Sequence, residues 1–479
     1  MKKSILIVIL LTVGITQAQR KWTLKECVEY ALENNIDIKQ SELDLQAVEA
    51  DKLASLGNWL PTLNASTNVV ESSGLNFNPT TNRAETTTFL SSTPGVNAGY
   101  TLFDGLRNIR ASQRAEISEL AAQYRLSKMK DDISLLVANS YLRVILDKEN
   151  LKSLIRQNEV TKEQIERTQE LVNAGVLPEG DLLEIKATDA NEQQTIVTAE
   201  NSIRISLISL AQLLLIKDYE NFDIQEEGYN LVNEDIAGKS VDEIIDAAKE
   251  VRSEVKIAQQ NVELAMKDLQ IARSSYYPRL TAFFGYNTRF TSTTNFDLRV
   301  DPDNPIVTEQ IGRVESTGEA VVADVPNTFF VEEPALPYFE QLWRNDGISY
   351  GLSLSIPILN GLSSRSNVIR NKINLERTQN QLDQTELDLE STVYQAFVDA
   401  EGALKSYDAA LSALESQQLA FNYAEERYNV GIINSFEYSQ SKFNLDAAII
   451  TANRSKYDYI FKLKVLELYF GIPAVELKF

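Results

Sequence analysis

The chain has 479 residues and is strongly acidic, with 68 Asp and Glu against 46 Lys and Arg and a net charge of −22. This charge excludes nucleic acid as the default partner, because phosphate binding needs a basic face. The sequence has no histidine and one cysteine, Cys27, so imidazole catalysis, histidine zinc sites and intrachain disulfides are excluded. No constellation of residues supports an enzyme, and we expect no cofactor and no metal site.

Residues 1–18 have the pattern of a secretory signal peptide. Two lysines precede an apolar run over 5–13, and small residues at 16–18 offer a cleavage site. The alternative, a membrane-spanning helix, needs about 20 apolar residues, and polar residues from position 12 onward shorten the run. No later segment has 18 uninterrupted apolar residues. We therefore expect an exported chain that, if it spans a membrane, does so with strands.

Three intervals contain no proline, 104–172, 179–277 and 358–472, and long helices are predicted within them. Proline costs about 3 kcal/mol in a helix interior, and apolar residues recur in these intervals every three or four positions. The pattern predicts long helices at about 105–172 and 361–429. Each would extend about 100 Å at about 1.5 Å per residue, so such helices must pack along one another as coiled coils. A string of shorter bundle helices is the alternative.

The prolines cluster instead near segments that alternate apolar and polar residues, the period of a β-strand. Strands are predicted at about 61–71, 95–104, 279–290 and 347–358. The apolar positions of the last segment, predicted to face lipid, are Ile348, Tyr350, Leu352, Leu354 and Ile356. A length of about 10 residues suits a tilted strand that crosses a bilayer, although a half-buried soluble sheet gives the same alternation.

The two halves of the chain repeat each other. Gly105 and Gly361 stand in matching motifs 256 residues apart, and so do Gly175 and Gly431. Around Pro61 and Pro278 the offset is 217, so about 39 residues are inserted between the strands of the second half. A duplication this regular indicates a fold rather than a catalytic site.

The repeat divides the chain into a signal peptide (1–18), a first repeat (19–216), a linker (217–239) and a second repeat (240–479). Each repeat reads helix, strand, loop, strand, very long helix, tight turn, helix. The insert at 291–347 holds five prolines and eleven acidic residues against three basic ones, which predicts a solvent-exposed loop. The fold class is α+β, mainly α.

This doubled arrangement resembles the TolC-like outer-membrane efflux protein family over nearly the whole mature chain. The most specific segments are Tyr428-Asn429-Val430-Gly431-Ile432, Asn173-Ala174-Gly175-Val176-Leu177, Phe103-Asp104-Gly105 and Leu359-Asn360-Gly361. The resemblance implies a homotrimer in the outer membrane, in which each chain gives four strands to one 12-stranded β-barrel and the helices form a periplasmic tunnel. Independently, a four-stranded sheet leaves two unpaired edges that lipid does not tolerate, so several chains must share a barrel.

The resemblance also implies that the two helix-to-helix turns contact a periplasmic adaptor protein. The implied docking residues are Gly175, Val176, Leu177, Gly431, Ile432 and Ile433. Glycine suits the left-handed backbone of a tight turn, so a simple helix end explains these glycines equally well.

A periplasmic gate is the second implied site, formed by Asp181, Glu184, Tyr428, Glu437 and Gln440. The family pattern places acidic residues after each turn glycine, and Gln440 departs from it. Tyr428 matches a tyrosine that holds the closed state, with Asp181 as its expected partner. Ile433 stands where the family has a basic residue, so that part of the latch is missing. The alternative is that these acids only offset the helix dipole.

The implied function is an outer-membrane exit duct of a tripartite efflux or type I secretion system. It conducts substrate passively from an inner-membrane pump. A soluble exported coiled-coil scaffold or periplasmic adaptor is the alternative. The sequence does not name the cargo, the pump or the adaptor, because drug, metal and peptide ducts share this architecture.

Overall fold

The computed structural model describes residues 21–78, 82–226 and 238–472. The predicted signal peptide lies outside the described residues, as does the part of the predicted linker at 227–237. The chain forms two compact units, which we call the helical unit (1–52, 113–269 and 370–479) and the strand unit (53–112 and 270–369).

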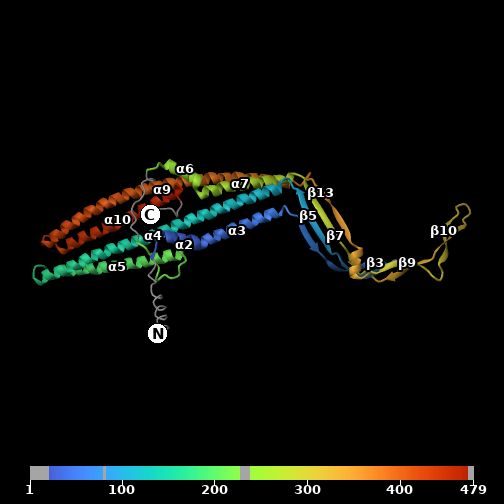
Figure 1. The fold of residues 1–479 in the computed structure, drawn as a ribbon, viewed down its shortest axis with the longest axis horizontal. Helices are drawn as coiled ribbons and strands as arrows, with labels where there is room; N and C mark the ends of the chain where they lie inside the picture. The colour runs from blue at the N-terminus through green and yellow to red at the C-terminus, as the bar shows by residue number, and fades with distance from the viewer. Residues whose placement is uncertain (1–20, 79–81, 227–237, 473–479) are drawn as a thin grey trace, which may run out of the picture. The chain divides into compact units, whose positions relative to one another are not determined.

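The helices come in pairs of matched length, which confirms the predicted duplication (Figure 1). α2 (Leu24–Asn34) and α6 (Val241–Val251) have 11 residues each, and α3 (Ile36–Gly57) and α7 (Ser253–Arg273) have 22 and 21. α4 (Arg107–Asn173) and α9 (Ser363–Asn429) have 67 each, whereas α5 (Glu179–Leu213) and α10 (Ser435–Tyr469) have 35 each. Within the described residues, no helix is both long and apolar enough to cross a membrane.

Both 67-residue helices begin two residues later than expected. Gly105 and Leu106 adopt φ values of +69° and +68°, and the matching Gly361 and Leu362 adopt +61° and +64°. Two consecutive left-handed residues cannot continue a right-handed helix, so each helix starts only after the pair. At Gly105 an added Cβ would lie 2.7 Å from the Ser274 carbonyl oxygen, which explains why that position needs glycine.

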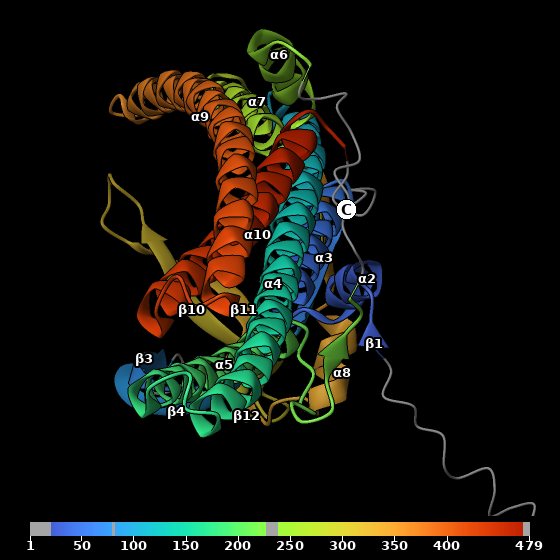
Figure 2. The same ribbon diagram turned by 90° about the vertical axis from the view of Figure 1, so that its left-hand side faces the viewer.

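The core of the helical unit forms where the short N-terminal helix α2 packs against the middle of α4. Cys27 and Ala31 of α2 are buried together with Val137 and Ile145 of α4. The single hydrogen of the Tyr141 hydroxyl is shared between the carbonyl oxygens of Gln225 (2.8 Å) and Trp22 (3.2 Å). These bonds fix β1 (Lys21–Trp22) beside β6 (Asp223–Ile224), its parallel partner. A second cluster joins α6, α7, α9 and α10 in the corresponding way. Figure 2 shows α4 and α5 side by side, and α9 and α10 likewise.

The strand unit contains a four-stranded antiparallel sheet in the order β13-β7-β5-β2. Its strands are β2 (Thr62–Ser66), β5 (Gly95–Phe103), β7 (Arg279–Asn287) and β13 (Gly347–Ser355). Each repeat supplies two neighbouring strands, and β7 and β5 join the repeats at the centre. β13 and β2 pair on one side only, so they form the two edges of the sheet.

The register places apolar residues on one face of this sheet and mostly polar or small residues on the other. One row across the four strands consists of Leu63, Ala98, Phe284 and Tyr350. The next row, which points to the opposite face, consists of Asn64, Asn97, Gly285 and Ser349. On the edge strand β13, the four apolar side chains from Ile348 to Leu354 are 60–80% exposed. On the central strands of the same face, Phe284 is 43% exposed, whereas Ala98 and Tyr100 are half-buried.

The strands differ from the sequence-based boundaries at several points. The segment expected as one strand over 61–71 breaks after Ser66, and β3 (Val69–Asn78) then pairs with β4 (Arg83–Ser92) in a separate three-stranded sheet with β8 (Phe290–Thr291). β13 ends at Ser355 rather than 358, since Pro357 has no N–H to donate.

The insert at 291–347 is exposed as expected, but it is not a simple loop. It folds into two antiparallel ribbons, β9 (Asn295–Val300) with β12 (Thr328–Glu333) and β10 (Ile306–Arg313) with β11 (Ala320–Pro326), followed by α8 (Tyr338–Arg344). Valine, isoleucine and phenylalanine favour strands even in an acidic, proline-bearing segment. The net charge alone therefore predicted exposure but not secondary structure.

Candidate functional site

The two helix-to-helix turns have the same backbone geometry. At the first turn, the Gly175 and Val176 amides donate to the carbonyl oxygens of Val172 and Leu171, both at 2.9 Å. At the second, Gly431 and Ile432 donate to Tyr428 (2.9 Å) and Arg427 (2.8 Å). This is the Schellman helix end, and both glycines adopt the left-handed conformation that it requires, with φ of +73° and +76°.

The turns expose a smaller apolar surface than the sequence predicts. Val176 and Ile432 are each 66% exposed, and Val430 is 71% exposed. Leu177 is only half-buried, whereas Ile433 is buried in a cluster with Tyr428 and Tyr438. Ile433 therefore anchors the turn from inside and does not belong to the exposed patch. We define the tip patch as Val176, Val430 and Ile432.

The family resemblance predicts that Tyr428 contacts Asp181, but the structure gives Tyr428 a different partner. Its side chain is buried, its hydroxyl is hydrogen-bonded to that of Thr168 on α4 at 3.2 Å, and its ring stacks on Tyr438 at a centroid distance of 4.9 Å. Arg167 on α4 adds a bond to Asn429 at 2.8 Å. Tyr428 thus ties α9 to α4, and the expected Tyr428–Asp181 latch is wrong for this structure.

Two carboxylates of the predicted gate, those of Asp181 and Glu184 on α5, share one serine hydroxyl as a hydrogen-bond partner. The buried Ser435 hydroxyl lies 3.0 Å from both Asp181 Oδ1 and Glu184 Oε2, which links the start of α10 to the first turns of α5. Glu437 is exposed, and its backbone amide is capped by the Asn434 side chain at 2.9 Å. The Gln440 amide donates to Asn444, one turn further along the same helix.

Sequence reasoning missed a buried charge network that joins α4, α5 and α10. Lys442 is 2% exposed, and its ammonium donates to Glu192 Oε1 (2.7 Å), to the Gln157 carbonyl oxygen (2.5 Å) and to the Thr161 hydroxyl. Glu192 also accepts hydrogen bonds from Asn158 (3.0 Å) and Thr161 (2.9 Å). A buried ion pair is tolerated only when such additional bonds satisfy it, so this network fixes how the three helices meet.

Beside this network lies a groove of about 710 Å³ between α5 and α10. It is lined by the predicted gate residues Glu184 and Gln440 and by two phenylalanines, Phe436 and Phe443. Asp446 also lines it, and burial raises the pKa of this carboxyl to about 7, with Lys442 opposing and Glu192 adding to the rise. We call this the α5–α10 groove. Among the described residues, no group of acidic residues or Cys is placed to hold a metal ion.

Comparison with known proteins identifies the family. The model of the family described as Outer membrane efflux protein matches residues 27–214 and 339–471. The chain belongs to the outer membrane efflux protein family. The TolC-like family predicted from the repeat motifs is confirmed, and with it an outer-membrane location and a role as an efflux duct. The match omits 215–338, which contains most of the insert.

Solved structures of outer-membrane channels share the fold of this efflux protein. The Campylobacter jejuni CmeC channel aligns with a TM-score of 0.72 at 18% identity, covering 94% of this chain and 85% of that one. VceC from Vibrio cholerae aligns at 0.67 and 15%, covering 95% and 96%. The open-state Neisseria gonorrhoeae MtrE channel aligns at 0.64 and 16%, covering 95% and 88%. No curated protein matches the sequence significantly.

Asp446 gives this efflux protein a pH-dependent stability. The pKa of this carboxyl is about 7 in the folded protein and about 4 in the unfolded chain. Its ionisation therefore opposes folding. The penalty is fully present above about pH 7 and is relieved as the pH falls towards 4. We expect Asp446→Asn to stabilise the protein at pH 8 by on the order of 2 kcal/mol and to have little effect at pH 4.5.

The measurement is the melting temperature of the helical circular dichroism signal at both pH values. Asp399→Asn, at an exposed position on α9, is the matched control and should leave the melting temperature unchanged. An equal shift of the Asp446→Asn variant at both pH values would contradict the burial argument.

Proposed function

We propose that this efflux protein is the passive outer-membrane exit duct of a tripartite efflux or type I secretion assembly. The observation that carries the proposal is the four-stranded sheet with one apolar face and two open edges. The sequence has no nucleotide-binding P-loop, so an inner-membrane pump would supply the energy. The duct itself needs no chemistry, and the role requires no catalytic residue.

Three copies would join their sheets into one 12-stranded barrel. An open edge in lipid leaves backbone N–H and C=O groups unpaired, each at a cost of several kcal/mol, so β13 of one copy must pair with β2 of the next. The apolar row that includes Phe284 and Tyr350 supports a lipid-facing surface, with the polar row around Asn97 towards the lumen. The number three follows the family resemblance, because two copies would close eight strands by the same argument.

In this proposal the apolar residues of β13 contact lipid and the helices extend the duct into the periplasm. Ile348, Tyr350, Leu352 and Leu354 alternate with serine and glycine and are exposed in the single chain. Ile356, also predicted to face lipid, follows the end of the strand and is 58% exposed. A soluble scaffold would leave a contiguous apolar sheet face in water, so this face favours the duct over the scaffold.

The tip patch would dock a periplasmic adaptor. Val176, Val430 and Ile432 are exposed aliphatic residues on two turns of the same geometry, which would present equivalent surfaces to a partner. Gly175 and Gly431 hold the backbone of these turns, and the buried Ile433 supports the second one. Exposed aliphatic residues at a helix end suit an apolar helical partner.

The entrance of the duct would be lined by Asp181, Glu184 and Glu437. Equivalent carboxylates from three chains repel one another by about 1 kcal/mol per pair at about 4 Å in a water-like dielectric, which favours cations at the opening. In the structure the Ser435 hydroxyl lies beside Asp181 and Glu184, whereas the Tyr428 hydroxyl is hydrogen-bonded to Thr168. Gln440 contributes no charge.

Charging the tip patch tests the adaptor contact. Replacing Val176 and Ile432 together with aspartate puts charge into the apolar contact, and we expect at least a tenfold loss of adaptor cross-linking. The measurement is in-cell cross-linking from a photoreactive residue at position 430 to a periplasmic adaptor, with Val197→Asp as control, because Val197 is 54% exposed on α5 away from the turn. Unchanged cross-linking in the double variant would contradict docking at the tips.

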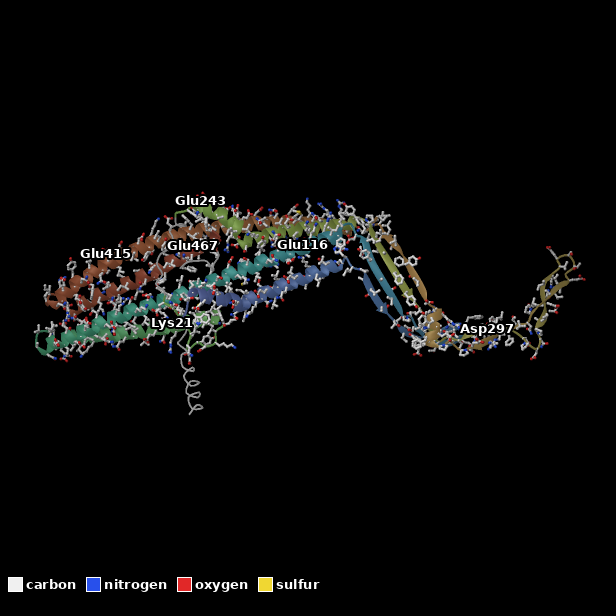
Figure 3. The ribbon with its side chains drawn as sticks, in the orientation of Figure 1. Lys21, Glu116, Glu243, Asp297, Glu415 and Glu467 are labelled. Carbon is white, nitrogen blue, oxygen red and sulfur yellow. The ribbon has the colours of Figure 1, made fainter. Side chains whose placement is uncertain are left out.

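Neutralising the entrance tests the duct. Glu437→Ala removes one carboxylate from each chain, so the cation preference of single channels in planar bilayers should fall. Glu415→Ala, at an exposed site on α9 labelled in Figure 3, is the control and should leave selectivity unchanged. If Glu437→Ala conducts with the selectivity of the unmodified protein, Glu437 does not line the entrance.

A further inference from the structure

The α5–α10 groove has the size and the mixed lining of a small-molecule site. Its volume of about 710 Å³ lies within the range of about 300–1,000 Å³ that is usual for such sites. Apolar residues of α4 and α10, among them Leu154, Ala447 and Ile450, line it together with the threonines and carboxylates of α5 and α10. The lining of the groove is therefore partly polar and partly apolar.

The groove keeps a surplus of negative charge. Three carboxylates line it, those of Glu184, Glu192 and Asp446, against the single ammonium of Lys442. That ammonium is already committed to Glu192 and to two oxygens of α4. A molecule in the groove would meet carboxylates without a free protein cation beside them.

Asp446 lines the groove, and one of its two carboxylate oxygens has no hydrogen-bond partner in the described part of the chain. Its Oδ1 atom is buried and has no hydrogen-bond partner among the described residues. Buried polar atoms in folded proteins are nearly always paired, so a groove-lining carboxylate with an unpaired buried oxygen favours a ligand that brings a hydrogen-bond donor or a positive charge to that carboxylate. The charged groups that face it are Lys442, one turn away on its own helix, and Glu192 on α5.

Two aromatic rings stand next to these carboxylates. Phe436 and Phe443 are seven residues apart, so they share one face of α10, and they are 61% and 67% exposed. Exposed phenylalanines offer an apolar platform, and the faces of their rings also attract cations. The combination differs from an ordinary acidic helix surface, on which the carboxylates would be solvated and the neighbours polar.

We propose that the α5–α10 groove binds an organic cation with an aromatic or apolar body, its positive charge beside Asp446 and its body against Phe436 and Phe443. The inference extends the proposed function, since it names a class of molecule that the duct would hold. Binding does not depend on transport, however, so it is measured on the purified protein and its failure is distinct from a failure of the conductance test.

The test is binding of rhodamine 6G, a fluorescent aromatic cation, to the full chain in nanodiscs at pH 8, measured by fluorescence anisotropy with empty nanodiscs as the blank. We expect saturable binding of this cation and none of the anionic dye fluorescein. Asp446→Asn should weaken the affinity at least tenfold, and so should Phe443→Ala. Binding to the unmodified protein should weaken as the pH is lowered through about 7, because Asp446 then loses its charge.

Asp399→Asn is the matched control and should bind like the unmodified protein. The Asp446→Asn variant is expected to be the more stable protein at pH 8, so its loss of affinity would not reflect misfolding. Equal affinity in all the variants would overturn the proposal by showing adsorption elsewhere. Absence of binding to the unmodified protein would overturn it as well, and is the result expected if a second copy of the chain covers the groove.

Discussion

The unpaired edges of the four-stranded sheet are the constraint on which the rest of the account depends. Among the described residues, β13 and β2 each pair on one side only, and the apolar side chains of β13 are exposed. Hydrogen bonding and burial cannot both be completed within one chain. Other copies along its edges and an apolar medium against its face would complete such a sheet, and the proposed shared barrel in the outer membrane would provide both.

A different constraint applies to the helical unit. Very long helices need specific polar contacts to fix their register relative to one another. Tyr428 with Thr168, Ser435 with Asp181 and Glu184, and Lys442 with Glu192 each join two helices near the turns. Each of these contacts uses a buried or partly buried polar group, which is costly when its partner is displaced. Two of these contacts involve predicted entrance residues, Asp181 and Glu184 with Ser435 and Tyr428 with Thr168, so in the proposed duct the same side chains would serve both stability and gating.

The repeated parts of the fold could be predicted from the sequence, because they follow from local rules. Proline-free intervals with helical periodicity gave α4 and α9, and the spacing of Gly105 and Gly361 gave the duplication. The strands of the insert were missed, since its charge indicated exposure and said nothing about backbone pairing. The break after Ser66 was missed because alternation continues across it while the partner strand changes.

The candidate site was harder to predict from the sequence, because it depends on contacts between helices that are distant in sequence. Lys442 is buried whereas Lys186, its equivalent in the first repeat, is exposed, so the repeat itself could not identify the network. The orphan oxygen of Asp446 is likewise visible only once α5 lies beside α10. Motif matching placed Tyr428 against Asp181, but the geometry of the turn directs its hydroxyl to Thr168 on α4. The adaptor-docking and gate roles remain predictions.

The most direct test of the central claim is the protein mass of the particle extracted from the outer membrane in detergent. The full chain would be expressed with its own N-terminus, the cells fractionated, and the purified particle measured by light scattering with the detergent contribution subtracted. An outer-membrane particle with a protein mass near three chains is the result that a shared 12-stranded barrel predicts. A water-soluble protein of one or two chains would contradict the shared barrel and favour the scaffold.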